Sequence, residues 1–162
     1  MAAPPKVLMP RWRRLDAAVE RLSQAAVESD TEVPDSTVLV LDALNHLWEV
    51  WIRVQGIHKR WPEQNDAVAG DAAGETAVAL IFARGGITHD LVEPGQRLGF
   101  GQQPFGTSPF GLATWYWSPY SDQRDGYKRR SDWYAARVAG QEVRRPLEAA
   151  YQWFSDQPDI AP

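Results

Sequence analysis

The chain has 162 residues, of which 44% are hydrophobic, so it is long and apolar enough to form one domain with a sizeable core, and wholesale disorder is excluded. Its formal net charge is −4 at pH 7, so it lacks the global positive charge typical of nucleic-acid-binding proteins. The sequence has no cysteine, which excludes disulfides, thiolate zinc sites and cysteine nucleophiles.

The sequence contains no segment suited to a membrane. No stretch reaches the roughly 18 uncharged apolar residues that a membrane-spanning helix requires. The apolar run near the amino terminus is too short for a signal peptide. We therefore expect a soluble, cytoplasmic protein with no membrane partner, and the lack of cysteine agrees with a reducing compartment.

Two helices are expected in the first third of the chain. Residues 1–10 contain three prolines and no periodicity, which predicts a flexible arm. In residues 11–29 apolar side chains recur at spacings of three and four, which predicts an amphipathic helix. Residues 36–60, with Asp35 or Ser36 as the N-cap, carry a wider apolar stripe, typical of a central helix that is covered on several sides.

The middle of the chain is predicted to hold one apolar helix between two loops. Residues 61–74 are rich in turn formers and predict a linker. An apolar helical segment follows, from about Glu75 to Glu93. Residues 94–126 are rich in glycine, proline and aromatic side chains, which predicts a long irregular insertion over the helical core, with "LATWYW" as a short strand.

Two short helices are expected near the carboxyl end. One begins near Ser131 and is closed by Gly140, and the next has Pro146 in its first turn. The expected fold class is therefore all-α: a four- to five-helix bundle that forms a single domain over residues 11–157, followed by a tail at residues 158–162.

Four basic clusters interrupt this acidic sequence. They are Arg11-Trp-Arg13-Arg14, Lys59-Arg60, Lys128-Arg129-Arg130 and Arg144-Arg145. Ordinary surface charge accounts for such clusters unless folding brings two or three of them together.

Histidine chemistry is limited to three positions. His46 lies between apolar stripes of the second helix, and we expect a partly buried ring that Asp42 or Asn45 hydrogen-bonds. Asp42 and His46, four residues apart, also match half of a metal site, but the second pair that a di-iron bundle needs is missing, so no metal and no cofactor are expected. His58 lies at the charged end of the same helix, where the helix dipole accounts for a cation.

The stretch "ALIFARGGITHDLV" contains the third histidine. Arg84 interrupts an apolar run, where a charge is unfavourable unless it has a partner. His89 follows five residues later, beside Asp90. One interpretation is a polar site built into an apolar helix. The other is that Gly85 and Gly86 end the helix and that His89 begins a new turn.

"LIFARGGITHDLV" resembles the signature of the HEPN superfamily, in which an arginine is followed, after four to six residues, by a histidine on a helix. The carboxyl-terminal "DWYAARVAGQEVRRPLEAAYQWF" is similar to the closing helices of some small bacterial proteins of this kind. The residue after the arginine is commonly asparagine, aspartate or histidine in active members, whereas here it is Gly85.

The resemblance implies an all-α homodimer in which Arg84 and His89 of the two copies face each other across a cleft. Active members are metal-independent endoribonucleases, so it also implies RNA as substrate, a toxin or defence role, and an antitoxin or regulatory protein as partner. Gly85 and the negative charge leave open a non-catalytic module that binds a protein or a nucleotide ligand. A stand-alone structural or regulatory protein is the third alternative.

The aromatic insertion suggests a second way to bind RNA. Trp115 and Trp117, together with the basic side chains Lys128, Arg129 and Arg130, are candidates for stacking and neutralising a single strand, and Asp90 is a further candidate binding residue. The alternative is that these aromatic rings only cover the core.

Overall fold

The computed structural model describes residues 7–26, 29–86, 91–95, 114–124 and 126–160. Within these ranges the chain forms six helices and one sheet of two short strands, so the all-α fold class is confirmed. No helix of the described part is long and apolar enough to cross a membrane.

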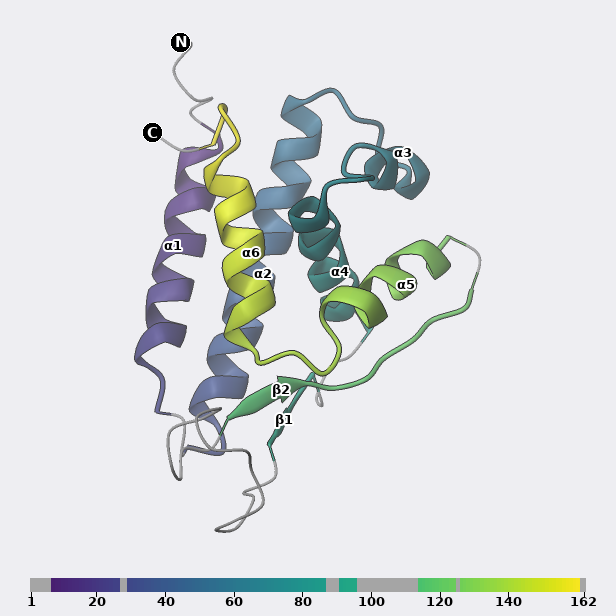
Figure 1. Cartoon of the computed structure of the whole chain (residues 1–162). Helices are drawn as coiled ribbons and strands as arrows, with labels where there is room; N and C mark the ends of the chain where they lie inside the picture. Colours follow the sequence, from purple (N-terminus) through teal and green to yellow (C-terminus); the bar gives the residue numbers. More distant parts are fainter. Residues whose placement is uncertain (1–6, 27–28, 87–90, 96–113, 125, 161–162) are drawn as a thin grey trace.

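Four helices form the body of the molecule (Figure 1). They are α1 (Met9–Gln24), α2 (Glu32–Val54), α4 (Ala72–Gly86) and α6 (Arg144–Ser155). α1 packs along α2, and α4 packs against α2 on one side and α6 on the other. The core between them contains a cluster of aromatic rings from α2 and α6, with Trp51 and Trp153 edge to face at 5.3 Å between ring centroids.

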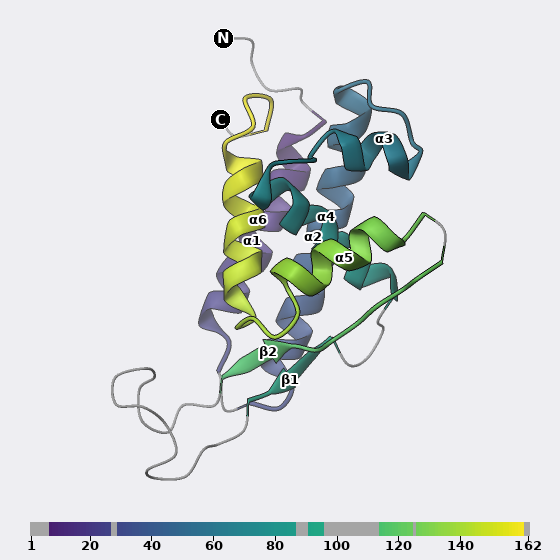
Figure 2. The ribbon, with the colours of Figure 1, turned by 45° about the vertical axis from the view of Figure 1, so that its right-hand side comes forward.

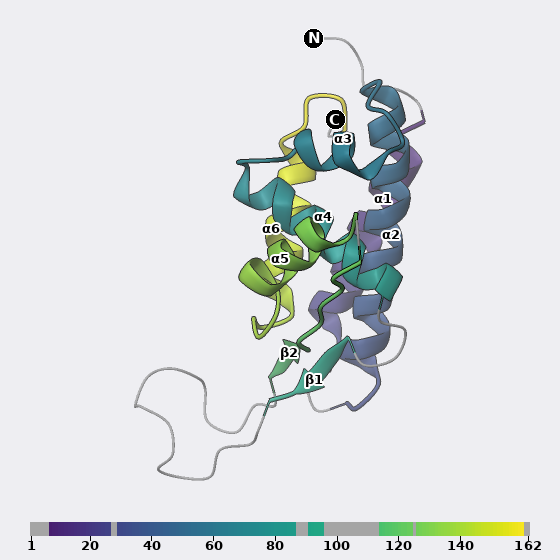
Figure 3. The same ribbon diagram turned by 90° about the vertical axis from the view of Figure 1, so that its right-hand side faces the viewer.

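Two further helices pack on one side of this body. α5 (Lys128–Arg137) lies across α4, and the short α3 (Trp61–Asp66) lies beside α5 (Figures 2 and 3). α3 was not expected, because residues 61–74 contain many turn formers. Pro62 is nevertheless compatible with the first turn of a helix, where no backbone N–H is needed.

The second helix begins at Glu32, earlier than expected, and ends at Val54 instead of residue 60. Pro34 does not break it, because this proline stands in the first turn, so the N-cap is Thr31 and not Asp35 or Ser36. The chain turns away at Gly56, whose φ of +67° is a backbone conformation that favours glycine.

The helix predicted from about Glu75 to Glu93 is α4, and it ends earlier than expected, at Gly86. The strand β1 (Val92–Pro94) lies where the end of this helix was predicted. β1 pairs antiparallel with β2 (Trp115–Trp117), where a strand was expected, in the register Val92 opposite Trp117. β2 is also bonded to the loop before α6, since the Val143 N–H donates to the Trp115 carbonyl at 2.9 Å.

The carboxyl-terminal helices follow the prediction closely. α5 begins three residues before Ser131, Gly140 lies just beyond it with φ +71°, and Pro146 stands in the first turn of α6. Beyond α6, Ile160 is fully buried, so the described part of the predicted tail packs on the domain.

Candidate functional site

Helix α4 is buried from Gly74 to Ala83 and reaches the surface at both of its ends. The side chains of residues 77–80 and of Ala83 are fully buried. Arg84 follows directly, and 48% of its side chain is exposed. The arginine therefore marks the point where an apolar helix reaches the surface.

Arg84 has a partner on α2. Its Nε donates to Oδ1 of Asp42 at 2.7 Å, and 26% of the Asp42 side chain is exposed. Among the described residues no protein acceptor contacts Nη1 or Nη2 of Arg84. The charge that the sequence left unexplained is thus satisfied by a carboxylate 42 positions earlier in the chain.

His89 and Asp90 lie outside the described residues, so the structure does not place them relative to Arg84. The described histidine nearest to Asp42 in the chain is His46, one turn further along α2. The structure corrects the expectation for it: the ring is exposed, Asp42 binds Arg84, and Asn45 donates to Glu49 at 3.4 Å. His58 is also exposed, in the turn after α2.

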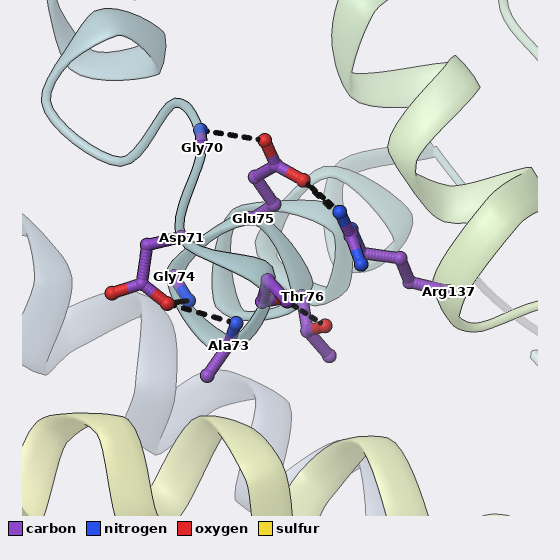
Figure 4. A network of polar contacts seen from close by, with 8 residues as sticks. Gly70, Asp71, Ala73, Gly74, Glu75, Thr76 and Arg137 are labelled. Atoms are coloured by element: carbon purple, nitrogen blue, oxygen red, sulfur yellow. Dashed lines mark hydrogen bonds and ion pairs between the residues drawn. The ribbon is translucent and has the colours of Figure 1, made fainter.

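The opposite end of α4 carries a network of polar contacts with a structural role (Figure 4). Oδ1 of Asp71 accepts from the backbone N–H groups of Ala73 and Gly74 at 3.0 and 3.2 Å, which caps the helix. Oδ2 of the same carboxylate accepts from the Trp153 indole at 2.8 Å, which ties the cap to α6.

Glu75 adds a connection to α5 in the same network (Figure 4). Its side chain is only 9% exposed, and it accepts from the Gly70 N–H at 2.9 Å. It also accepts from the Arg137 guanidinium, through Nε at 2.8 Å and through Nη2. Both carboxylates at this end of α4 are fully engaged by protein donors, so they fix the helix in place and leave no free ligand group.

The three basic residues predicted to bind RNA behave differently from one another. Lys128 and Arg129 are exposed and pair with Asp132 and Asp66 at 2.9 and 2.7 Å. Arg130 is only 2% exposed, which contradicts its predicted role as a direct RNA contact, because a phosphate cannot reach its guanidinium.

Arg130 is held by neutral groups. It donates to Oδ1 of Asn65 at 2.8 Å and to Oε1 of Gln64 at 3.1 Å, and its Cζ lies 4.4 Å from the ring centroid of Trp61. Burial lowers the pKa of Arg130 to about 10, so the side chain is still a cation at neutral pH. It joins α5 to α3.

Trp115 and Trp117 are also buried, at 6% and 0% exposure. The Trp117 indole donates to the Val143 carbonyl at 3.1 Å within the core. Neither ring offers a face on which a base can stack, so the stacking role predicted for these two residues is wrong and the alternative, core covering, describes them. Phe100, Phe105 and Phe110 of the insertion lie outside the described residues.

The partly exposed aromatic rings beside the basic residues are others, namely Trp61, Tyr127 and Trp133. The sequence predicts a linker around Trp61 and the body of a helix around Trp133. The sequence carried no signal that would bring Trp61 to α5, because the contact depends on how two segments more than 60 residues apart pack together.

Comparison with known proteins identifies no relative: no family model matches the sequence, and no curated protein or solved structure matches it significantly. Within the described residues, no group of three histidine, aspartate or glutamate side chains is arranged to hold a metal ion.

Proposed function

We propose that the chain is a HEPN-like, metal-independent endoribonuclease of the toxin or defence type, with Arg84 and His89 as its catalytic residues at a homodimer cleft. The single observation that carries the proposal is the position of Arg84. A guanidinium at the exposed end of an otherwise buried helix, with Nη1 and Nη2 unused by described residues, is accessible to a phosphate.

The chemistry requires one base and one cation. The His89 imidazole takes the proton of a ribose 2′-hydroxyl, whose oxygen attacks the adjacent phosphorus. The Arg84 guanidinium stabilises the negative charge that develops on the phosphoryl oxygens. The bond from phosphorus to the 5′-oxygen breaks, that oxygen takes a proton from solvent, and the His89 imidazolium returns its proton to solvent. The products are a 2′,3′-cyclic phosphate and a free 5′-hydroxyl.

Asp42 has a positioning role in this scheme. By accepting from Nε it fixes the plane of the guanidinium and leaves Nη1 and Nη2 as the fork that faces a phosphate. A carboxylate at this place also competes with the phosphate for the same cation. Asp42 therefore lowers the affinity of Arg84 for phosphate while it orients the guanidinium.

A dimer is the arrangement that would bring one arginine and one histidine together. If the chain kept a helical path to His89, a step of five residues would rotate by about 140° and rise by about 7.5 Å, so one copy would not present both side chains on one face. We therefore propose that Arg84 of one copy works with His89 of the other, and that an antitoxin or regulatory protein controls the dimer.

A non-catalytic binding module is the second candidate function. The observation that favours it is the ion pair itself, because Asp42 already neutralises Arg84, in a chain with a net charge of −4. Such a module binds a protein or a nucleotide ligand through the same exposed end of α4 without cleaving it.

Cleavage assays with histidine variants distinguish the two functions. Wild type is expected to cleave RNA in the presence of EDTA, and His89→Ala to abolish cleavage. His46→Ala and His58→Ala are matched controls, because both rings are exposed and both variants are expected to stay active. A dimer, measured by light scattering, that binds RNA or a protein but cleaves no RNA supports the binding module, and a monomer contradicts both.

A further inference from the structure

Folding brings two of the basic clusters together. Trp61, which follows Lys59-Arg60 in the sequence, packs edge to face on Tyr127 with 4.2 Å between ring centroids, and its ring also contacts Arg130. Arg129 reaches Asp66 of α3 from α5. The two clusters are therefore neighbours in the fold. We call their exposed side chains, together with those of Arg124 and Trp133, the α3–α5 surface: Lys59, Arg60, Arg124, Lys128, Arg129 and Trp133.

The charge balance of this region differs from that of the rest of the chain. Residues 58–66 and 120–133 together hold six lysine and arginine side chains against five aspartate and glutamate side chains. The remaining residues hold 11 against 16. This region thus has a net charge of +1 in a chain of net charge −4, and local potential, not total charge, governs the approach of a polyanion.

Arginines on the α3–α5 surface lie over aromatic rings. The Cζ of Arg124 lies 4.7 Å from the ring centroid of Tyr127, and that of Arg129 lies 5.0 Å from the ring centroid of Trp133. The Arg124 and Arg129 side chains are 72% and 46% exposed. Guanidinium planes and aromatic rings are both groups on which unpaired RNA bases stack.

The ion pairs of Lys128 and Arg129 do not prevent an RNA from binding, whereas Arg124 is held by the nearly buried Asp122 and is not counted as a principal contact. Arg129–Asp66 and Lys128–Asp132 are exposed pairs, and such pairs contribute about 0–1 kcal/mol. Stacking of one base contributes about 1–3 kcal/mol. A nucleic acid that places phosphates near the cations and a base on the stack is therefore favoured over the intramolecular pairs.

Arg130 supports the surface from beneath. Its buried cation is bonded to the amide oxygens of Gln64 and Asn65, and no described carboxylate pairs with it. The positive charge is thus not cancelled locally, and the same side chain fixes Trp61 and α3 against α5. Its replacement by a shorter side chain would loosen the surface, so it is a supporting residue and not a contact.

We propose that the α3–α5 surface binds single-stranded RNA, with Arg60, Arg129 and the Arg129–Trp133 stack as its principal contacts. The assignment deepens the proposed function, since it names unpaired RNA as the substrate class, but it depends on residues other than Arg84 and His89. Unpaired RNA is favoured over a duplex because stacking requires bases that are free of the helix. It is favoured over an acidic peptide because Arg124 and Arg129 lie over aromatic rings, and stacked groups of this kind bind bases, which an acidic peptide lacks.

The test is a fluorescence anisotropy titration with a short labelled unpaired RNA, using the His89→Ala protein so that the probe stays intact. Arg60→Ala/Arg129→Ala is expected to weaken binding by about tenfold or more, which corresponds to about 1.4 kcal/mol. The matched control is Arg13→Ala/Arg14→Ala, which removes the same charge from an exposed part of α1 and is expected to change affinity by less than about threefold.

A second variant separates stacking from charge. Trp133→Leu leaves every charge in place and is expected to weaken binding of unpaired RNA while leaving the slope of log Kd against log salt unchanged. Thermal unfolding of each variant checks that the fold is intact.

The proposal is overturned if the His89→Ala protein binds no unpaired RNA, if both double variants weaken binding equally, or if duplex RNA or a phosphopeptide binds as tightly as the unpaired strand. Because binding is read without cleavage, loss of the nuclease proposal leaves this result intact. Conversely, if the protein cleaves RNA but its affinity for RNA does not depend on Arg60 and Arg129, only the proposal for the α3–α5 surface is contradicted.

Discussion

The two ends of helix α4 use charge in opposite ways. At the amino end, Glu75 is nearly buried and is bonded to Arg137 and to the Gly70 N–H, and Asp71 joins the helix cap to α6. At the carboxyl end, Arg84 forms one exposed pair with Asp42. Buried charges must be fully satisfied, because an orphaned one is strongly unfavourable, whereas an exposed charge is solvated and stays available to a ligand.

The contrast separates structure from function within a single element. The amino end fixes the position of α4 between α5 and α6, and the carboxyl end holds a cation at the surface on a rigid support. Substitutions at the first end are therefore expected to change stability, and substitutions at the second to change activity with little effect on stability.

The largest expected effect on stability is that of Arg137→Ala. The change leaves the Glu75 carboxylate nearly buried without its cation, and because Arg137 itself is one-third exposed we expect a loss of about 2–3 kcal/mol. Arg84→Ala, its counterpart at the other end, is expected to lose less than about 1 kcal/mol. Urea unfolding measures both, and equal losses would remove the distinction between the two ends.

Two glycines of α4 offer a matched pair. A Cβ at Gly74 would lie 3.0 Å from the Val68 Cβ and 3.1 Å from the Trp153 Nε1, so Gly74→Ala is expected to destabilise by about 1–3 kcal/mol. A Cβ at Gly85 would have no neighbour within 4 Å among the described residues, so Gly85→Ala is expected to stabilise by about 0.5–1 kcal/mol. Thermal unfolding gives the signs, and a shared sign would contradict the packing described.

The helix cap at Asp71 ranks next. Asp71→Ala removes the acceptor of two backbone N–H groups and of the Trp153 indole, and we expect a loss of about 1–2 kcal/mol. Asp71→Asn keeps an acceptor oxygen and is expected to lose less. If both variants unfold at the same urea concentration as wild type, the cap contributes nothing.

Alkaline pH tests the burial of α5 against α4. The Tyr134 hydroxyl donates to the Ser118 carbonyl at 2.7 Å, and burial raises the pKa of Tyr134 above its usual value. The unfolded chain then loses this proton first, so stability falls as pH rises above about 10. Tyr134→Phe is expected to reduce that fall in urea unfolding, and an unchanged pH profile would contradict the burial of Tyr134.

The smallest effect on stability is expected for Asp42→Asn, at less than about 1 kcal/mol. Removing the negative charge frees the Arg84 cation for phosphate but weakens the bond that orients it. We therefore expect KM for RNA and kcat to fall together, measured in steady-state cleavage. If kcat rises instead, Asp42 acts only as a competitor of the phosphate.

Local patterns in the sequence predicted most of the helices but not their bounds or contacts. The apolar stripes of α1 and α2, and Pro146 in the first turn of α6, were sufficient to predict that these helices exist, because periodicity and proline geometry act within a few residues. The predicted arm at residues 1–10 is wrong at its end, since α1 begins at Met9, and this helix ends at Gln24 instead of residue 29. α3 and β1 were missed, since each depends on packing against a distant segment. β1 exists because Val92 pairs with Trp117.

The candidate site shows the same limit. The sequence identified Arg84 as a charge in need of a partner, but it did not identify Asp42, which lies 42 residues away. It selected Lys128, Arg129 and Arg130 as candidate binding residues, of which the first two are exposed and Arg130 is buried, and it paired them with Trp115 and Trp117, which are buried. The sequence of a glycine-rich segment does not show whether its aromatic side chains are exposed or buried in the core, so only the packing in the structure distinguishes the two cases.

The most direct test compares RNA cleavage and unfolding for Arg84→Ala and Arg137→Ala in parallel. Arg84→Ala is expected to lose cleavage by at least about 100-fold while keeping its unfolding free energy within about 1 kcal/mol of wild type, and Arg137→Ala to lose stability but to cleave wherever it remains folded. Full cleavage by a folded Arg84→Ala protein would contradict a functional role for this end of α4.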